Sequence, residues 1–288
     1  MRGSVCVVGS TNLDLVATAA VLPRPGETVM GHAYAEHPGG KGLNQAAAAA
    51  RSGAATAFVS AVGDDAAGGR LLDVMRTEGI DVSSVATAPG VPTGRALIGV
   101  SDDGTNSIIV VSGANSTVRV DDIHGAAVVL SQLEVPVETV QEAFSMARAV
   151  GALTILNPAP AAPLPPELLA VTDIIVPNEH EVELLGGATA LLAAGVTTVV
   201  VTQGAAGALV VTADGEFRVR PYRVASVDTT AAGDTFCGAL SARLAAGDVL
   251  VDALDWASAA AAISTTRPGA VPSIPTADEV EALVRSAD

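Results

Sequence analysis

Residues 227–238 combine two aspartates, six positions apart, with residue types that suit phosphoryl chemistry. Their sequence, VDTTAAGDTFCG, holds small and hydroxyl-bearing residues and no basic side chain. A valine-rich segment precedes them and an alanine-rich segment follows, so we expect a helix to begin near Gly233. Asp234 then lies in the first helical turn, where unpaired N–H groups and the helix dipole favour anions.

Asp234 is suited to act as a general base in that position. A carboxylate there can accept the proton of an attacking hydroxyl, while the backbone N–H groups of Ala232 and Gly233 stabilise a transferring phosphoryl group. Helix capping by aspartate is the competing interpretation. Capping does not account for the glycine directly before Asp234, which favours the catalytic interpretation.

Asp228 needs a separate interpretation, because it is too far from Asp234 to share a proton with it reliably. Its neighbours Thr229 and Thr230 offer further oxygen atoms. Loops rich in oxygen ligands bind hard cations. Asp228 is therefore a candidate cation ligand, with stabilisation of a turn as the alternative.

The glycine-rich stretch at residues 38–45, PGGKGLNQ, is a second candidate binding loop. It is not a phosphate-binding P-loop, because Lys41 is followed by Gly42 instead of Ser or Thr. Its glycines let a ligand approach the backbone, and an alanine-rich helix begins directly after them. A cationic side chain and an amide suit sugar hydroxyls. An ordinary glycine turn before a helix is the alternative.

Three shorter stretches follow predicted strands. In GSTNLD, Asp14 with Asn12 could hold a vicinal diol, although both residue types are common turn formers. In PNEHE, Asn178 and Glu181 share one face of a helix start and could organise a hydrated magnesium ion. TQGAAG, at residues 202–207, is a glycine turn that could lie along the phosphates or the adenine of a nucleotide.

The elements that must position these loops alternate between strand and helix. Short Val/Ile-rich runs predict buried strands at residues 5–8, 56–62, 126–130, 153–156, 173–176 and 198–202. Alanine-rich stretches predict helices at residues 44–52, 67–78, 137–150, 179–185, 234–246 and 251–265. This alternation predicts an α/β fold with a mainly parallel sheet covered on both faces. Ligands of such sheets bind outside the carboxyl ends of the strands.

Two regions break the alternation. Residues of about 14–37 and 91–112 carry strand-like segments, including GRALIGV and NSIIVV joined by the turn SDDG. They predict a small antiparallel layer that acts as a lid on a single domain spanning residues 1–288. Strand alternation directs Ala96 and Ile98 of this layer inward.

Composition excludes several classes of protein. A formal net charge of −16 argues against nucleic-acid and anionic-membrane partners, which demand a basic face. Cys6 and Cys237 are far apart in apolar or small-residue surroundings, which indicates a reducing compartment without disulfides or metal clusters. The uncharged tract at residues 186–213 divides into helix, strand, turn and strand, so we expect no membrane span. With no signal peptide visible, we expect a soluble cytoplasmic protein.

Together these stretches resemble the ribokinase branch of the PfkB-type carbohydrate kinases. GGKGLNQAAAAARSGA is similar to the first signature of that family, and DTTAAGDTFCGAL is similar to the second. Their order along the chain also matches, as GSTNLD, GGKG, TGRALI, QLE, LNPAPA, NEHE, TQGAAG, DTTAAGD and TTRPGAVPS. The resemblance implies transfer of the γ-phosphate of ATP to a sugar hydroxyl, on a three-layer αβα sandwich with a small β-sheet lid.

The resemblance also implies a role for each matching position. Asp234 would be the base, beside an anion hole of Ala231, Ala232 and Gly233. The sugar ligands would be Asn12, Asp14, Gly39, Gly40, Lys41, Asn44, Ala96, Ile98 and Glu134. The nucleotide would lie along Asn178, Thr202, Gln203, Gly204, Ala205, Ala206, Gly207, Gly233 and Ser258. Asn178 and Glu181 would act through Mg²⁺, and an activating K⁺ would be held by Asp228, Thr230, Ser264, Arg267, Gly269 and Ser273.

Within the family, the lysine of GGKG and the NPAPA stretch favour D-ribose as the substrate and ribose 5-phosphate as the product. The alternatives are a kinase for 2-deoxyribose, fructose, ketodeoxygluconate or a nucleoside such as pseudouridine, and a non-catalytic sugar-binding protein. One departure concerns the nucleotide, since Ser258 stands where many ribokinases carry an asparagine near the adenine. Similar enzymes are often homodimers joined through their lids, so we expect one here.

Overall fold

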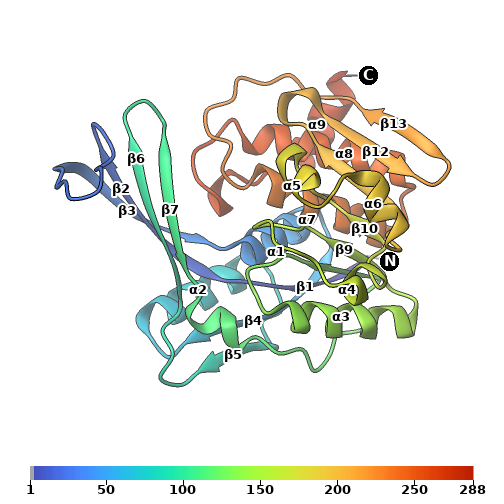
Figure 1. Ribbon diagram of the computed structural model, residues 1–288, viewed down its shortest axis with the longest axis horizontal. Coiled ribbons are helices and arrows are strands. Elements are labelled where there is room, and N and C mark those ends of the chain that lie inside the picture. The colour runs from blue at the N-terminus through green and yellow to red at the C-terminus, as the bar shows by residue number, and fades with distance from the viewer. Residues whose placement is uncertain (1–2, 288) are drawn as a thin grey trace.

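The computed structural model describes residues 3–287, which build a nine-stranded sheet and a separate four-stranded sheet (Figure 1). The large sheet has the order β13-β12-β11-β10-β9-β8-β1-β4-β5. Seven of its strands run parallel: β1 (Ser4–Val8), β4 (Ala55–Gly63), β5 (Val85–Ala88), β8 (Val128–Ser131), β9 (Leu153–Leu156), β10 (Ile174–Ile175) and β11 (Thr198–Thr202). The edge hairpin β12 (Ala208–Thr212) and β13 (Gly215–Val219) is antiparallel.

The central strand β1 shows why the sheet is covered on both faces. Its side chains alternate between two buried clusters, with Val5 and Val7 in one and Cys6 and Val8 in the other. Both cysteines of the chain are free and buried, and burial raises the pKa of each thiol. The observed strands and helices form the αβα sandwich that the alternating pattern predicts.

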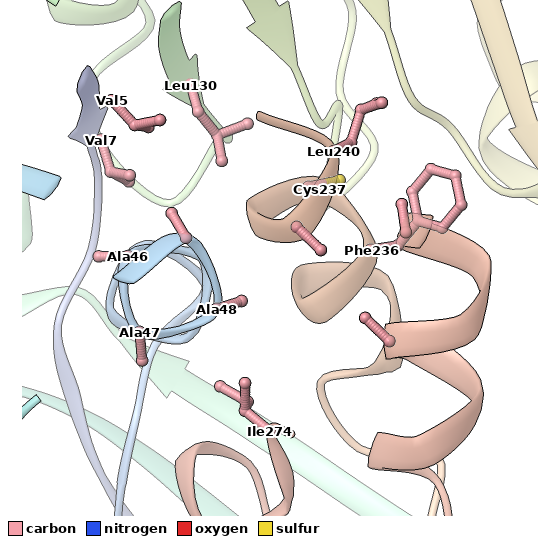
Figure 2. Close-up of a cluster of buried hydrophobic side chains, with 14 of the residues drawn as sticks. Val5, Val7, Ala46, Ala47, Ala48, Leu130, Phe236, Cys237, Leu240 and Ile274 are labelled. Atoms are coloured by element: carbon pink, nitrogen blue, oxygen red, sulfur yellow. The ribbon is translucent and has the colours of Figure 1, made fainter. Parts of the chain in front are cut away.

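One face of the sheet is covered by α1 (Lys41–Arg51), α2 (Ala66–Thr77), α7 (Ala232–Ala246), α8 (Leu250–Ser264) and α9 (Ala277–Ala287). Figure 2 looks down α1, which lies between β1 and α7 with small alanine side chains on its packed sides. A Cβ at Gly238 of α7 would lie 2.4 Å from the carbonyl oxygen of Gln45. The two helices therefore pack closely through small residues.

The other face is covered by α3 (Val137–Val150), α4 (Pro166–Leu169), α5 (Glu179–Leu184) and α6 (Ala188–Ala193). The uncharged tract at residues 186–213 divides into α6, β11, the short 3₁₀ turn Gly204–Ala206 and β12, as its pattern predicts. No helix within residues 3–287 combines the length and the hydropathy that crossing a bilayer requires.

The small sheet stands out from the body in the order β3-β2-β6-β7 (Figure 1). Its strands are β2 (Asn12–Ala19), β3 (Gly31–Gly39), β6 (Gly94–Ser101) and β7 (Asn106–Val111). The prediction of a purely antiparallel layer is wrong, because β2 and β6 pair in parallel at the centre. Each hairpin is antiparallel, but the first strand of each leaves the body in the same direction.

Candidate active site

The predicted sugar ligands come from loops at the carboxyl ends of β1 and β8 and from the N-termini of α1 and α7. Asn12 and Asp14 begin β2 directly after β1, and Glu134 follows β8. Lys41 and Asn44 lie in the first turn of α1, and Asp234 lies in the first turn of α7. These elements meet where an open parallel sheet binds its ligands.

The Asp234 carboxylate is held by two amides of α1. Its Oδ2 accepts a hydrogen bond from Asn44 Nδ2 at 3.0 Å, and its Oδ1 accepts one from Gln45 Nε2 at 3.0 Å. Asp234 is 5% exposed. Neither carboxylate oxygen accepts a backbone hydrogen bond within residues 3–287, so the Asp234 side chain does not cap α7.

The Glu134 carboxylate is fixed in the same way, by donors from two loops. Its Oε2 accepts from the Ser10 hydroxyl at 2.5 Å and from the backbone N–H of Lys41 at 3.1 Å. The backbone N–H of Glu134 donates to Gln132 Oε1 at 2.9 Å. The Oε1 atom of Glu134 accepts no hydrogen bond from the residues that the structure describes.

Asn12 and Asp14 are placed differently from each other. Asn12 is 2% exposed, and its Oδ1 accepts from Asn115 Nδ2 at 2.7 Å, so half of its amide is used inside the protein. Asp14 lies against Gly39, where a Cβ would be 2.1 Å from Asp14 Oδ2. Gly39 therefore has to be glycine for the Asp14 carboxylate to reach this site.

Charged side chains lie close together around Asp14, Glu134 and Asp234. Burial, followed by the charges of Glu134 and Asp234, raises the pKa of Asp14 to about 7. The charge of Asp234 raises the pKa of the Lys41 ammonium, and this outweighs the lowering by burial. Asp14, Glu134 and Asp234 thus form an acidic cluster with Lys41 beside it, and its carboxylates can accept the hydroxyl protons of a sugar.

The N-terminus of α7 offers backbone donors. Ala231, directly before the helix, has a φ of 58°, in the left-handed region, and no side chain caps α7. The N–H of Ala232 donates to the carbonyl of Thr229 at 3.2 Å. Within residues 3–287, the N–H groups of Ala231, Gly233 and Asp234 have no such acceptor. These free donors suit an anion.

A cavity of about 520 Å³ opens beside Gly233 on the side of β11 and α8. Six predicted nucleotide residues line it: Thr202, Gly204, Ala205, Gly207, Gly233 and Ser258. Asn178, Gln203 and Ala206 lie outside its lining. The sequence interpretation did not single out Tyr222, Arg223 or Phe236, which also line it. A larger and more open groove of about 800 Å³ between α1 and α2 is lined by none of the predicted residues.

Ser258 does not direct its hydroxyl donor into this cavity. Its Oγ donates to the carbonyl of Arg220 at 3.0 Å. The neighbouring Tyr222 hydroxyl donates to Asp255 Oδ2 at 2.8 Å, and burial with this carboxylate raises the pKa of Tyr222 to about 12. The wall at this end is therefore held by internal hydrogen bonds.

Asn178 and Glu181 form a capping box at the start of α5. Asn178 Oδ1 accepts from the N–H of Glu181, and Glu181 Oε2 accepts from the N–H of Asn178, both at 2.8 Å. The capping role accounts for one oxygen of each side chain. Within the described residues, Glu181 Oε1 accepts no hydrogen bond.

Asp228 joins the loop before α7 to the loop after α8. Its Oδ1 accepts from the N–H and hydroxyl of Thr230 at 2.9 and 2.6 Å, and its Oδ2 accepts from the N–H of Gly269 at 2.8 Å. Burial opposes ionisation, but these hydrogen bonds outweigh it and lower the pKa of Asp228. The Arg267 guanidinium pairs with Glu279, so only the backbone carbonyl of Arg267 could meet a cation.

Ser264 and Ser273, also predicted for the cation, are buried, and their hydroxyls donate to carbonyls of their own turns at 2.8 Å. Their oxygens keep lone pairs for a ligand. No cluster of three His, Cys, Asp or Glu side chains suited to a metal occurs within the described residues. One carboxylate with neutral oxygens fits a monovalent cation better than a transition metal.

Comparison with known proteins places the chain among sugar kinases. Residues 2–277 match the pfkB family of carbohydrate kinases. The chain is 41% identical to a ribokinase of Haemophilus influenzae, over 97% of each chain. The fold matches a Thermotoga maritima ribokinase with a TM-score of 0.92 and 35% identity, covering 98% of this chain and 99% of that one. It also matches an Arabidopsis thaliana ribokinase complexed with ribose and ATP, with a TM-score of 0.90, 31% identity and 99% coverage of both.

Proposed function

The chain belongs to the pfkB family of carbohydrate kinases, and we propose that it transfers the γ-phosphate of ATP to the 5-hydroxyl of D-ribose. The observation that carries the proposal is the position of Asp234. Its carboxylate lies in the first turn of α7, between the acidic cluster and Gly233, which lines the 520 Å³ cavity. A kinase needs its base at that junction, because the hydroxyl and the phosphate meet there.

In this proposal the sugar binds at the acidic cluster of Asp14, Glu134 and Asp234. Asp14 and Oε1 of Glu134 accept hydroxyl protons, and Asn44 Oδ1, which is buried and has no partner among residues 3–287, accepts another. A sugar hydroxyl at this amide would satisfy a buried acceptor that is otherwise costly. The remaining polar contacts of the sugar would come from Lys41, Gly39, Gly40 and Asn12. Its apolar contacts would come from Ala96 and Ile98 of β6.

Asp234 accepts the proton of the attacking hydroxyl, and the new O–P bond forms as the bond to the β-phosphate oxygen of ATP breaks. The free N–H groups of Ala231, Gly233 and Asp234 stabilise the charge that develops on the transferred group. The N–H of Ala232 joins them only if its turn with Thr229 opens. ATP occupies the 520 Å³ cavity between residues 202–207 and Ser258.

Two cations complete the proposal. Mg²⁺ would be held through water by Asn178 and Glu181, and it would neutralise phosphate charge. K⁺ would be held by the Asp228 carboxylate and by hydroxyl and carbonyl oxygens around Thr230, Ser264, Arg267, Gly269 and Ser273. This ion would add positive charge behind the N-terminus of α7.

We also propose that two copies pair through their small sheets, which act as lids. β7 is exposed along its whole length, with Ile108, Ile109, Val110 and Val111 between 47% and 62% exposed. An apolar edge strand of this kind invites a partner strand. A monomer in light scattering at micromolar concentration would contradict the pairing. We place the protein in the cytoplasm, where ATP is available and buried thiols such as Cys6 stay reduced.

ADP release tests the substrate. Ribose, 2-deoxyribose, fructose, ketodeoxygluconate, pseudouridine and adenosine are supplied in turn, with and without K⁺. The proposal expects the highest kcat/KM for ribose. An inert ribose beside an active alternative would overturn the choice of sugar while keeping the kinase, and no turnover with any sugar would favour a sugar-binding protein.

A further inference from the structure

Gln45 is a buried polar side chain in a helix that is otherwise built for close packing. It precedes five consecutive alanines in α1 and is 0% exposed. The backbones of α1 and α7 approach closely around it, and Figure 2 shows how small the neighbouring side chains are. A side chain that only filled this space would be apolar. The amide therefore calls for a reason beyond packing.

The amide nitrogen of Gln45 bridges two acceptors. It donates to Asp234 Oδ1 at 3.0 Å and to Asn157 Oδ1 at 3.2 Å. Asn157 Nδ2 donates to the carbonyl of Val176 at 3.0 Å, so the oxygen of Asn157 has to face Gln45. Rotating the Gln45 amide by half a turn would bring its Oε1 against Asp234 Oδ1 and Asn157 Oδ1, which are both hydrogen-bond acceptors. Asn157 thus fixes which end of Gln45 meets Asp234.

This orientation has a cost in stability. Gln45 Oε1 is buried and has no hydrogen-bond partner within the described residues. A buried acceptor without a donor destabilises the folded state. Local conflicts of this kind are expected at functional sites. The conflict exists because the nitrogen of Gln45 is committed to Asp234 and Asn157.

We infer that Gln45, oriented by Asn157, is a positioning residue that fixes the rotation of the Asp234 carboxylate. The inference rests on the proposed function, in which Asp234 accepts the sugar proton. With Gln45 on Oδ1 and Asn44 on Oδ2, the carboxylate cannot turn away from the hydroxyl. General-base catalysis depends on this alignment. Asn157 is the first residue of the NPAPA stretch, so this inference gives the stretch a role in orienting Gln45.

Gln45 differs from the charged groups around Asp234. Asp234 interacts electrostatically with Lys41 on α1, Asp14 on β2 and the Cys237 thiol on α7, and Glu134 after β8 interacts with Asp14 and Lys41. Each of these groups can titrate. The Gln45 amide is neutral at all working pH values, so its contribution to the alignment does not change with pH.

Gln45→Met tests the inference, because methionine has a similar length and lacks the donor. We expect kcat to fall by about 10- to 100-fold, as for loss of a hydrogen bond to a charged group. KM for ribose and ATP should stay within about threefold. Tm should fall only slightly, because removal of the unpartnered Gln45 Oε1 offsets part of the loss of the hydrogen bond to Asn157 Oδ1.

Asn157→Ala provides the second measurement. Alone it should lower kcat, because Gln45 loses its orienting partner. Added to Gln45→Met it should lower kcat no further, since Asn157 acts through Gln45. Independent, multiplying losses would overturn this coupling. Ser241→Ala is the matched control, because Ser241 is buried in α7 and its hydroxyl donates only to the carbonyl of Cys237; its kcat should match the parent.

The outcomes separate the inference from the proposed function. A Gln45→Met variant with unchanged kcat, or one in which KM for ribose and ATP changes as much as kcat, would overturn the positioning role. If Asp234→Asn keeps near-normal turnover, the proposed base itself is wrong, whatever Gln45→Met does. An inactive Asp234→Asn beside a normal Gln45→Met would leave the proposed function standing and remove only the inference.

Discussion

The two ends of the candidate site are built by opposite means. At the acidic end, Asp234 and Glu134 are each tied by at least two hydrogen bonds to other elements. At the cavity end, most lining residues are small, and the hydroxyl of Ser258 donates to the backbone carbonyl of Arg220. The acidic end is defined by side chains, and the cavity end by backbone and shape.

This contrast suggests how each end recognises its ligand. Fixed carboxylates and amides can distinguish the hydroxyl positions of one sugar, because a misplaced hydroxyl leaves a buried polar group unpaired. A cavity of small residues accepts a flat ring through contact area, with less dependence on any one side chain. Substitutions should therefore have large effects at the acidic end and small effects at the cavity end.

The largest effect is expected at the junction of the two ends. Asp234→Asn removes the proton acceptor, so turnover should fall by about 100- to 10,000-fold, the range of general-base catalysis. Ribose should still bind with similar affinity, because the asparagine keeps the size and one acceptor of the side chain. ADP release gives the turnover, and calorimetry gives the affinity. Turnover within tenfold of the parent would contradict the base role.

The acidic end should also respond to pH through Asp14. Its pKa of about 7 in the empty protein means that the ionised acceptor is lost as pH falls from 8 to 6. Ribose should therefore bind about tenfold more weakly at pH 6 than at pH 8. ATP affinity should change less, since Asp14 does not line the cavity. An unchanged ribose affinity across this range would remove Asp14 from the sugar site.

The same residue predicts a change in stability. The pKa of Asp14 is raised from 3.8 to about 7 on folding, so the folded state binds the proton more tightly than the unfolded state. Its contribution to stability is present below pH 3.8 and is lost as pH rises through about 7. Asp14→Asn should raise the Tm of the sugar-free protein at pH 8, and by less at pH 5.5. A lower Tm at pH 8 would contradict this.

A smaller effect is expected behind the cavity end, at Asp228. Asp228→Ala should raise the K⁺ concentration for half-maximal activity by about tenfold, the effect of losing one charge-assisted contact. Na⁺ and K⁺ titrations of kcat measure this, with Asp214→Ala, at an exposed turn, as the control. An unchanged K⁺ response would contradict the assignment of Asp228 as a cation ligand. Its role would then be to connect two loops by hydrogen bonds.

The smallest effect is expected in the cavity. Ser258→Ala should change KM for ATP by less than about threefold, because the hydroxyl is bonded to the Arg220 carbonyl and Ser258 is one of many small lining residues. A Ser258→Asn variant extends the test, since a longer amide could reach a base. A tenfold rise of KM for ATP in Ser258→Ala would contradict the contrast between the two ends.

Much of the site was predictable because its residues lie in short continuous stretches. GGKGLNQ and DTTAAGD carry their own helix starts, so the places of Lys41, Asn44 and Asp234 followed from local sequence. Six of the nine predicted nucleotide residues line the cavity. Five of them lie in the short stretches TQGAAG and DTTAAGD, and the sixth, Ser258, lies on α8.

The residues that hold the site were not predictable in this way. Ser10 reaches Glu134 across 124 positions of sequence, and Asn115 reaches Asn12 across 103. Gln45 lies inside a signature, but nothing local indicates that it bridges Asp234 and Asn157. The parallel pairing of β2 with β6 was missed for the same reason, because it joins two hairpins separated by four other elements.

By itself the sequence determined the layered α/β architecture and the loops that carry the chemistry, because hydrophobic period, glycine turns and helix starts are local properties. Only the tertiary structure decided how those loops act together. It brought Glu134 and Asp234 close to both Asp14 and Lys41, raised the pKa of Asp14, and set two amides of α1 against Asp234. Burial and hydrogen-bond partners depend on which distant segments meet, and that is settled by packing.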